Sequence, residues 1–375
     1  MQRKLVSVVG ARPQFVKLAP LCRVFESTAY ERSVEHIIVH TGQHYDAGMS
    51  DVFFDELKIP RADVDLGVGS ASHGVQTARM LEKLEATLIE LAPDLVVVYG
   101  DTNSTLAGAL AAAKLHIPVA HMEAGLRSFN RAMPEEINRI VADHTANQLH
   151  APTLTAMDNL AREGLAEKSV RTGDIMRDAL LFNREIALQK SSVVQRLGLR
   201  GKRYGVVTIH RAENTDGHHL IELLRTLDHI AGSALPLIFP VHPRTARRLQ
   251  TESSPTGGFS HLVMVEPLGY LDMLALLDGA LLALTDSGGL QKEAFFMNCP
   301  CVTLRKETEW LETVRSEGNI VAGNDRVAIE RAVEHWLSTF AHEPPDFSAA
   351  ADEHFGRGDA ALVSARVLCE FLDNG

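Results

Sequence analysis

The sequence lacks any run of about 18 apolar residues, the length that a helix needs to cross a membrane. Positive charge is also scarce, because 37 lysines and arginines face 48 acidic residues and leave a formal net charge of -11. Nucleic acids and anionic membranes attract proteins through a broad positive field, so this balance disfavours both as partners. The short apolar run after the N-terminal charges is more typical of a strand than of a signal peptide, and we expect a cytoplasmic protein.

Cysteine is rare, and no metal-binding pattern is present. The four cysteines match no zinc spacing, so we expect reduced, buried thiols at Cys22, Cys299, Cys301 and Cys369. His36, His40 and His44 recur every four residues, but the β-branched segment 36–40 predicts a strand, in which residues four apart lie roughly 13 Å from each other. One ion cannot contact both of the first two, so we expect no metal site.

Two nucleotide-binding motifs are missing as well. The P-loop pattern G-x-x-x-x-G-K-[ST] does not occur. Gly67-Val-Gly69 lacks both the third glycine and the strand-to-helix position of the dinucleotide motif. P-loop nucleotidases and standard nicotinamide-dependent dehydrogenases are therefore disfavoured.

What the chain does contain is a regular alternation of short apolar segments with stretches of helical period. Apolar strands without strict alternation, separated by helices, indicate parallel sheets covered on both faces. The chain of 375 residues is long enough for two domains. We therefore predict an α/β protein with two Rossmann-like doubly wound domains. Strands are expected at 5–10, 36–40, 95–100, 118–122, 204–209, 235–240, 261–265, 280–285 and 300–304.

Helices are predicted between these strands, and one more closes the chain. The join between the domains is expected near 172–200, where strand signals fade. The last helix must pack on another element, because one of its faces is apolar. In the first half we predict helices over 14–27, 73–91, 103–115 and from Pro134 onward; the last helix covers 358–373, with Ala361, Leu362, Ala365, Leu368, Cys369 and Leu372 on its apolar face.

Ionisable side chains follow several predicted strands at the point where each strand ends. Asp101, Glu123 and His210 each lie at or just beyond such an end. Each alone is more often a cap or loop residue than a catalyst. Ligands of open α/β sheets bind beyond the carboxyl ends of the strands, so the three together indicate a reaction site, expected in the cleft between the two sheets.

Two strand-to-helix turns have the composition of anion sites. In the segment GARPQFVK, residues 10–17, free backbone N–H groups would combine with Arg12 and Lys17. In TDSGG, residues 285–289, Ser287 and two glycines can bring bare amides to a phosphate, and Glu293 one turn later could hold a ribose diol. The alternatives are a plain turn with solvated basic residues in the first case and helix capping in the second.

The segment HMEAGLRSFNRAMPEEINR, residues 121–139, is unusually rich in charge. Pro134 suits the first position of a helix whose apolar members Ile137, Ile140 and Val141 define the packing face. Glu135, Arg139 and Asp143 then share the opposite side. This side is either a solvated face with an i, i+4 pair between Glu135 and Arg139, or it faces the cleft, and periodicity does not decide between the two.

Nine blocks together identify a family resemblance. In this order along most of the chain, they resemble the non-hydrolysing UDP-N-acetylglucosamine 2-epimerases. The blocks are GARPQFVKLAP, TGQHYD, YGDTNSTLAGALAA, PVAHMEAGLRSFNRAMPEEINR, TGDIMRDA, TIHRAEN, PVHPRT, EPLGY and TDSGGLQKEA. The first block differs from the opening motif of related hydrolysing enzymes and favours the non-hydrolysing branch.

The resemblance implies a glycosyltransferase-B-like pair of Rossmann-type domains, usually in a homodimer, with a UDP-sugar in the cleft. It implies an N-terminal domain over 1–172, a UDP-binding domain over 173–355, and a last helix over 356–375 that packs back on the first domain. The implied activity is interconversion of UDP-N-acetylglucosamine (UDP-GlcNAc) and UDP-N-acetylmannosamine (UDP-ManNAc) for cell-surface polysaccharide, without a redox cofactor or metal.

Site residues follow from the resemblance position by position. Asp101, Glu123, Glu135 and His210 match the catalytic set. His242 lies near the substrate, Glu293 matches the ribose ligand, and Gln43 and His44 stand where a second, activating ligand would touch. The residues that match the diphosphate side are Arg12, Lys17, Arg211, Ser287, Gly288 and Gly289.

The implied chemistry explains the demand for acids. The C2 proton of such a sugar is not next to a carbonyl, so the family route is elimination of UDP to 2-acetamidoglucal and re-addition. Carboxylates must move protons on both faces while cations hold the diphosphate.

One segment departs from the family pattern. LRKETEWLETV, residues 304–314, looks more like relatives that act on UDP-2,3-diacetamido-2,3-dideoxyglucuronic acid, so the substituents at C3 and C6 stay open. A glycosyltransferase on the same scaffold is a further alternative.

Overall fold

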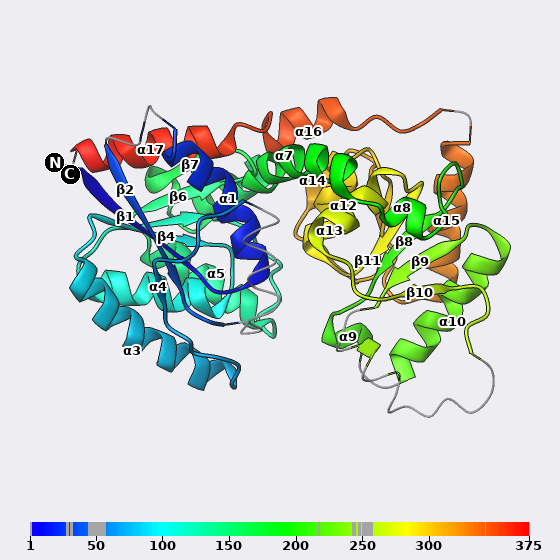
Figure 1. The fold of residues 1–375 in the computed structure, drawn as a ribbon, viewed down its shortest axis with the longest axis horizontal. Coiled ribbons are helices and arrows are strands. Elements are labelled where there is room, and N and C mark those ends of the chain that lie inside the picture. The colour runs from blue at the N-terminus through cyan, green and yellow to red at the C-terminus, as the bar shows by residue number, and fades with distance from the viewer. Residues whose placement is uncertain are drawn as a thin grey trace. The chain divides into compact units, whose positions relative to one another are not determined.

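The computed structural model describes residues 2–27, 30, 33–43, 58–215, 218–241, 245, 246, 249, 258–341 and 343–374. The chain divides into two compact units, each built around one parallel sheet (Figure 1). The first unit comprises Met1–Leu181 and Asp352–Gly375, and the second comprises Phe182–Ala351. No helix in the described part of the chain is both long and apolar enough to cross a bilayer.

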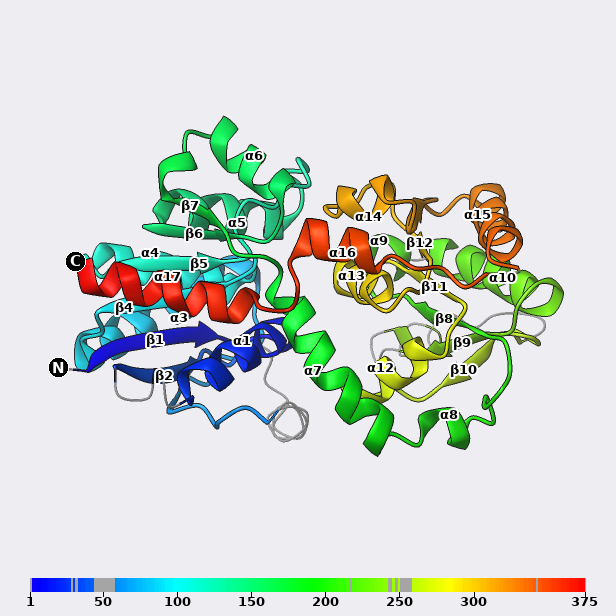
Figure 2. The ribbon, with the colours of Figure 1, turned by 90° about the horizontal axis from the view of Figure 1, so that it is seen from above.

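The first unit is a seven-stranded sheet in the order β3-β2-β1-β4-β5-β6-β7. Helices α1 and α17 cover one face, and α3, α4 and α5 cover the other (Figures 1 and 2). The elements are β1 (Arg3–Val9), α1 (Arg12–Phe25), β2 (Val34–His40), β3 (Val64–Asp65), α3 (His73–Leu91), β4 (Leu95–Tyr99), α4 (Asn103–Lys114), β5 (Val119–Met122), α5 (Pro134–Thr145), β6 (Gln148–Ala151), α6 (Leu154–Arg162), η1 (Ala166–Lys168), β7 (Ser169–Arg171) and α17 (Ala360–Asn374).

The second unit is a six-stranded parallel sheet in the order β10-β9-β8-β11-β12-β13. Apolar side chains of α10 and α15 pack on one face of this sheet, and those of α12 and α13 pack on β11 and β12 from the other. Its elements are α8 (Val193–Arg196), β8 (Gly205–Thr208), α9 (Ala212–Thr215), α10 (His218–Ser233), β9 (Leu237–Pro240), β10 (Val263–Val265), α12 (Tyr270–Asp278), β11 (Leu282–Thr285), α13 (Gly288–Phe296), β12 (Cys301–Thr303), α14 (Leu311–Arg315), β13 (Asn319–Val321) and α15 (Arg326–Thr339); α7 (Ile175–Lys190) and α16 (Ser348–Phe355) run across the division between the units.

The predicted fold class, two doubly wound α/β units, is confirmed, and every predicted strand is present within a few residues. The strands that the sequence did not indicate are β3, β6, β7 and β13. They lie toward the edges of the sheets and are short or polar, as in the segment Gln148–Ala151. Edge strands need less continuous apolar sequence, because fewer of their side chains are enclosed on both faces.

Helix α5 does not pack in the way its apolar residues suggested. Ile137 is 46% exposed, whereas Glu136, Arg139 and Asp143 are at most 4% exposed. The predicted apolar packing face is therefore wrong, and so is the solvated charged face. The buried face of α5 is the charged one, and it can be buried because each of these charges meets a partner.

The segment Thr172–Asp178 ties the end of the chain to the first unit. Asp174 N donates to Phe355 O at 2.8 Å, and Arg177 forms an ion pair with Asp352. Asp178 in α7 accepts hydrogen bonds from the first N–H groups of α17, those of Ala360 at 3.2 Å and Ala361 at 2.8 Å. The motif TGDIMRDA therefore has a structural role. We call the contacts of Asp174, Arg177 and Asp178 with residues 352–361 the clip.

Helix α17 leaves this clip and packs against α1. Ala361, Ala365, Leu368 and Leu372 are buried on its inner face, but Leu362 is 44% exposed, so its predicted place in the packing face is wrong.

The clip makes the stability of the first unit depend on pH. Burial raises the pKa of Asp178 from 3.8 to about 6, although the two N–H groups of α17 partly offset this. The folded state thus holds the proton more tightly, and the associated stability is present below pH 4 and is lost as the pH rises through 6. An asparagine side chain cannot ionise, so Asp178→Asn removes this loss. As the pH rises from 5 to 7.5, the free energy of unfolding of the variant should increase by roughly 1 to 2 kcal/mol relative to that of the wild type. Thermal unfolding of both proteins at each pH measures the difference, and a difference that stays constant with pH contradicts the assignment.

Candidate active site

The strand order brings the candidate acids of the first unit to one edge of its sheet. β4 lies between β1 and β5, with Val98 opposite Val8 and Tyr99 opposite Met122. The order of the strands reverses between β1 and β4, and open α/β sheets bind ligands beyond the carboxyl ends at such a point. Asp101 follows β4 there, and Glu123 follows β5.

Glu123 pairs with Lys17 across this edge. The Lys17 ammonium from α1 contacts Glu123 Oε2, and each side chain is only 9% exposed. Gly100 makes the approach possible, since a Cβ at this position would lie 2.9 Å from Lys17 Nζ and 3.3 Å from Glu123 Oε2. Glu123 itself has a φ of 67°, in the left-handed region that non-glycine residues rarely adopt.

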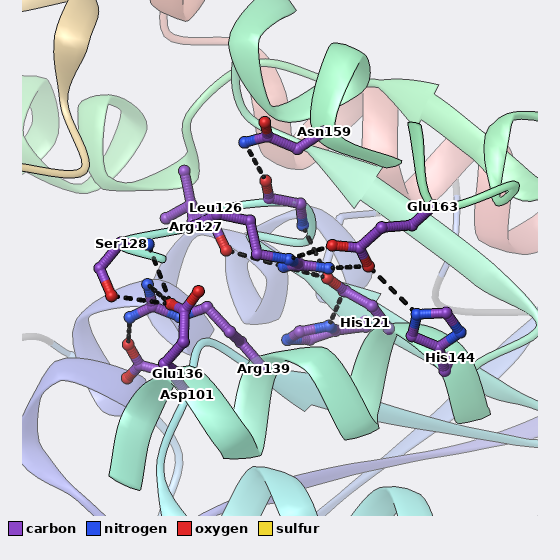
Figure 3. Close-up of polar contacts among 12 residues, drawn as sticks. Asp101, His121, Leu126, Arg127, Ser128, Glu136, Arg139, His144, Asn159 and Glu163 are labelled. Carbon is purple, nitrogen blue, oxygen red and sulfur yellow. Dashed lines mark hydrogen bonds and ion pairs between the residues drawn. The ribbon is translucent and has the colours of Figure 1, made fainter. Parts of the chain in front are cut away.

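Asp101 is held by Arg139 from helix α5 (Figure 3). The other end of the guanidinium contacts Glu136 Oε2 at 3.1 Å. Asn138 Nδ2 donates to the backbone oxygen of Asp101 at 2.9 Å. The predicted pair between Glu135 and Arg139 is therefore wrong, because Arg139 is engaged by Asp101 and Glu136 instead.

Glu136 also fixes the loop before α5. Its carboxylate accepts from Ser128 N and Oγ at 2.9 Å each (Figure 3). It also accepts from Phe129 N at 3.0 Å. Glu135, the neighbouring member of the predicted catalytic set, is half-buried in the first turn of α5. No hydrogen bond or ion pair joins it to another described residue, so the structure does not bring it into contact with Asp101 or Glu123.

Backbone N–H groups in the turn from β1 to α1 already have a hydrogen-bond partner in Gln14. Gln14 Oε1 accepts from Gly10 N at 2.8 Å and from Ala11 N at 3.0 Å. Two of the amides that were expected to be free for an anion are thus occupied. Arg12 is exposed at the start of α1, while Lys17 is buried against Glu123.

Gln43 and His44 are the two residues predicted to touch an activating ligand. Gln43 is buried, and its side-chain oxygen accepts from Ser104 N at 2.9 Å and Ser104 Oγ at 2.7 Å. His44 lies outside the described residues, as does His242.

In the second unit, His210 and Asp286 meet at the corresponding switch point. β8 and β11 are neighbours with Thr208 opposite Thr285, so the residues that follow them are adjacent. His210 Nδ1 lies 3.0 Å from Asp286 Oδ1, and the backbone N–H groups of His210 and Arg211 also donate to this carboxylate at 3.0 to 3.1 Å.

These donors decide the charge of Asp286. Burial alone would raise the pKa of Asp286, but the hydrogen bond and charge of His210 and the hydrogen bonds from Arg211 and Asn214 lower it overall. An ionised Asp286 orients the imidazole through Nδ1 and presents Nε2 on the opposite edge of the ring.

The first turn of α13 combines a capping serine with two half-buried glycines. Ser287 is the N-cap and accepts from Leu290 N at 3.4 Å. Gly288 and Gly289 occupy the first helical positions, where N–H groups have no partner within the helix. Glu293 is buried one turn later. Capping and anion binding are therefore compatible at this helix end, because the Ser287 side chain occupies the N–H of Leu290 only.

Sequence reasoning missed the roles of three residues that shape these clusters. A pair with Glu135 was one alternative for Arg139, and no role in the site was predicted for Asp286 or Gln14. Only the strand order could have indicated Arg139 and Asp286. It brings the end of β4 near α5 and the end of β8 next to the end of β11. The carboxylates and the oriented imidazole of these clusters can accept or donate protons. The cations can stabilise an anionic group. Among the described residues, no group of three or more histidine, cysteine or acidic side chains could hold a metal ion.

Comparison with known proteins agrees with the resemblance seen in the sequence. The family model for UDP-N-acetylglucosamine 2-epimerase matches residues 27–368. A UDP-N-acetylglucosamine 2-epimerase homolog from Methanococcus maripaludis is 46% identical over 368 residues, covering 97% of this chain and 99% of that protein. The UDP-2,3-diacetamido-2,3-dideoxy-D-glucuronate 2-epimerase of Pseudomonas aeruginosa is 45% identical over 327 residues, covering 86% and 89%.

Solved structures give the same result. The crystal structure of the UDP-GlcNAc 2-epimerase from Methanocaldococcus jannaschii, in complex with UDP-GlcNAc and UDP, has a TM-score of 0.84 and 40% sequence identity, with 98% of this chain and 99% of that chain covered. The family model and these relatives match nearly the whole length of this chain. This chain therefore belongs to the UDP-N-acetylglucosamine 2-epimerase family.

Proposed function

We propose that this protein is a non-hydrolysing 2-epimerase that interconverts UDP-GlcNAc and UDP-ManNAc. The observation that supports this most is the cluster of Asp101, Glu123, Lys17 and Arg139 at the carboxyl edge of the first sheet, in a chain that belongs to this family. Two carboxylates beside two cations at one sheet edge suit a reaction in which a proton and an anionic leaving group both move.

The reaction proceeds by elimination and re-addition. The C1–O bond breaks and its electron pair leaves with UDP, while the C2 proton passes to a carboxylate and a C1–C2 double bond forms. UDP then adds back to C1 as a proton reaches the other face of C2. Asp101, Glu123 and Glu135 are the proposed acids and bases for these proton transfers.

The pair between Lys17 and Glu123 has a direct role in this scheme. A diphosphate attracts the Lys17 ammonium more strongly than a single carboxylate does, since it carries more negative charge. Binding of the substrate would draw Lys17 toward the leaving group and release Glu123 as a base. One contact thereby couples arrival of the diphosphate to activation of the carboxylate.

The second unit supplies the proposed nucleotide site. His210, oriented by Asp286, completes the proposed catalytic set. Arg211 and the amides of Ser287, Gly288 and Gly289 hold the diphosphate. Glu293 binds the ribose, and His242 lies near the substrate. No redox cofactor takes part in this scheme, because C2 is deprotonated without oxidation of the sugar.

The second candidate substrate is UDP-2,3-diacetamido-2,3-dideoxyglucuronic acid, and a specific observation favours it. Arg305 and Glu309 form a buried ion pair at 3.0 Å within the unusual segment 304–314. Trp310 of this segment lies against the start of α13, 3.4 Å from the Cβ that a side chain at Gly288 would have. The segment thus borders the proposed diphosphate site, and one relative at 45% identity is named for that substrate.

We further propose a cytoplasmic homodimer that supplies precursors for cell-surface polysaccharide, with UDP-GlcNAc as an activator near Gln43 and His44. The domain assignment of 1–172, 173–355 and 356–375 is proposed on the same resemblance. A glycosyltransferase-B-type transferase would need an acceptor, so conversion of a UDP-sugar by the protein alone argues against it.

The elimination route predicts exchange of the C2 proton with solvent. In deuterium oxide without NAD, the enzyme should place deuterium at C2 of UDP-GlcNAc, form UDP-ManNAc, and release small amounts of UDP and 2-acetamidoglucal. Proton NMR follows all of these species in one sample. Turned-over substrate that keeps its C2 proton would exclude the mechanism.

Side-by-side kinetics decide between the substrates. We expect kcat/KM for UDP-GlcNAc to exceed that for the diacetamido glucuronic acid nucleotide by at least about tenfold, about 1.4 kcal/mol in transition-state binding. The opposite order would assign the protein to the second substrate and leave the mechanism in place.

Removal of the acids should abolish turnover and spare nucleotide binding. Glu123→Gln and Asp101→Asn are each expected to lower kcat by about 10² to 10⁴, because each removes a proton-transfer group while keeping the side-chain shape. Calorimetric titration with UDP should show an affinity close to wild type for Asp101→Asn, and an equal or higher affinity for Glu123→Gln, because Lys17 then has no charged partner to leave. The control is Glu167→Gln, an exposed carboxylate of the same unit. A variant of Glu123 or Asp101 that keeps wild-type kcat contradicts the assigned role.

A further inference from the structure

Asp143 of helix α5 is fully buried and joins a polar network that includes His121 and Arg127, both labelled in Figure 3. One carboxylate oxygen lies 2.7 Å from His121 Nδ1. The other lies 2.7 Å from Arg127 Nη1 and accepts from Gly125 N at 3.1 Å. A single carboxylate thus binds three groups on the strand and loop that surround Glu123.

His121 extends the network to the strand that precedes Asp101. Its Nε2 donates to Gly100 O at 2.7 Å, since a backbone carbonyl can only accept. Gly100 is the residue whose lack of a side chain lets Lys17 approach Glu123. The position of the carboxyl end of β4 therefore depends on an imidazole that Asp143 orients from the other side.

The backbone around Glu123 needs such support. Glu123 and Gly125 both have left-handed backbone, with φ of 67° and 82°, and this conformation is costly for glutamate. Asp143 holds Gly125 through its N–H, and Asn159 Nδ2 donates to Gly125 O at 3.0 Å. Gly125, two positions beyond Glu123, is thus held at both its N–H and its C=O group.

The network keeps its central carboxylate charged. Burial alone would raise the pKa of Asp143, but the charges and hydrogen bonds of His121 and Arg127 outweigh burial and lower it. Arg127 is itself shared with Glu163, which accepts from Nε and Nη2 at 2.8 Å each. Glu163 stabilises the arginine at the outer end of the network. Of these two carboxylates, Asp143 is the one that contacts His121 and Gly125, next to the acids.

We propose that Asp143 is a positioning residue for the epimerase reaction: through His121 and Gly125 it holds the backbone of Gly100 and Glu123 in the geometry that the acids need. This inference rests on the proposed function. Asp143 is fully buried and contacts His121, Arg127 and Gly125, so we expect it to act on the chemical step through these groups and to leave nucleotide binding to others.

The test compares Asp143→Asn with Glu163→Gln. Asn keeps the volume of the side chain but has one acceptor oxygen for three donors, so at least one of His121, Arg127 and Gly125 loses its partner. We expect kcat for C2 epimerisation of UDP-GlcNAc to fall about 10- to 100-fold, with KM within about threefold of wild type. Glu163→Gln weakens the same Arg127 without touching His121 or Gly125, and it should keep kcat within about twofold.

A double-mutant cycle separates positioning from general loss of stability. His121→Asn interrupts the link to Gly100, so combining it with Asp143→Asn should cost much less in kcat than the product of the two single effects. Thermal unfolding of all variants reports stability independently. Equal kcat losses in Asp143→Asn and Glu163→Gln, or independent effects of His121 and Asp143, would overturn the proposal.

A crystal structure of Asp143→Asn tests the same inference without turnover. The backbone of Gly100 or of 123–125 should be displaced relative to the wild-type crystal structure. An unchanged backbone at both places would overturn the proposal. If the wild type itself exchanges no C2 proton on either UDP-sugar, the proposed function fails, and this crystallographic comparison still decides whether Asp143 positions the two segments.

Discussion

Buried charge at the carboxyl edge of the first sheet is the constraint on which the rest of this unit depends. Ionised groups out of water are tolerated only where each meets an opposite charge or several hydrogen bonds. Lys17 meets Glu123, and Arg139 meets Asp101 and Glu136. Helices α1 and α5 must therefore bring their charged faces to the same edge, which explains why α5 leaves Ile137 partly exposed and encloses its polar residues.

The second unit uses the same strand order for a different purpose. At its switch point the buried acid Asp286 contacts an imidazole and backbone N–H groups. A helix with two glycines in its first turn stands beside it. The first sheet thus concentrates paired charges of the kind that suit proton transfer, whereas the second has a helix start of the kind that suits a phosphate.

The sequence was sufficient for the fold and for part of the site. The central strands are uninterrupted apolar runs, and their buried environment makes them easy to recognise. Helix α5 was misread, because its period locates the apolar residues but cannot say whether the charged side has partners. Those partners, Asp101 for Arg139 and His121 for Asp143, come from segments that only the strand order brings near. Glu135 was assigned from the family motif, and the structure joins it to no other described residue by a hydrogen bond or ion pair.

The clip between Asp174 and Phe355 has a consequence for the order in which the molecule can assemble during synthesis. The first unit is built from both ends of the chain, and the second is one continuous insertion within it. Domains generally fold as units while the ribosome advances. The second unit can thus fold as soon as residue 351 has emerged, whereas the unit that begins the chain must wait for α17, the last helix made, before its outer face is covered.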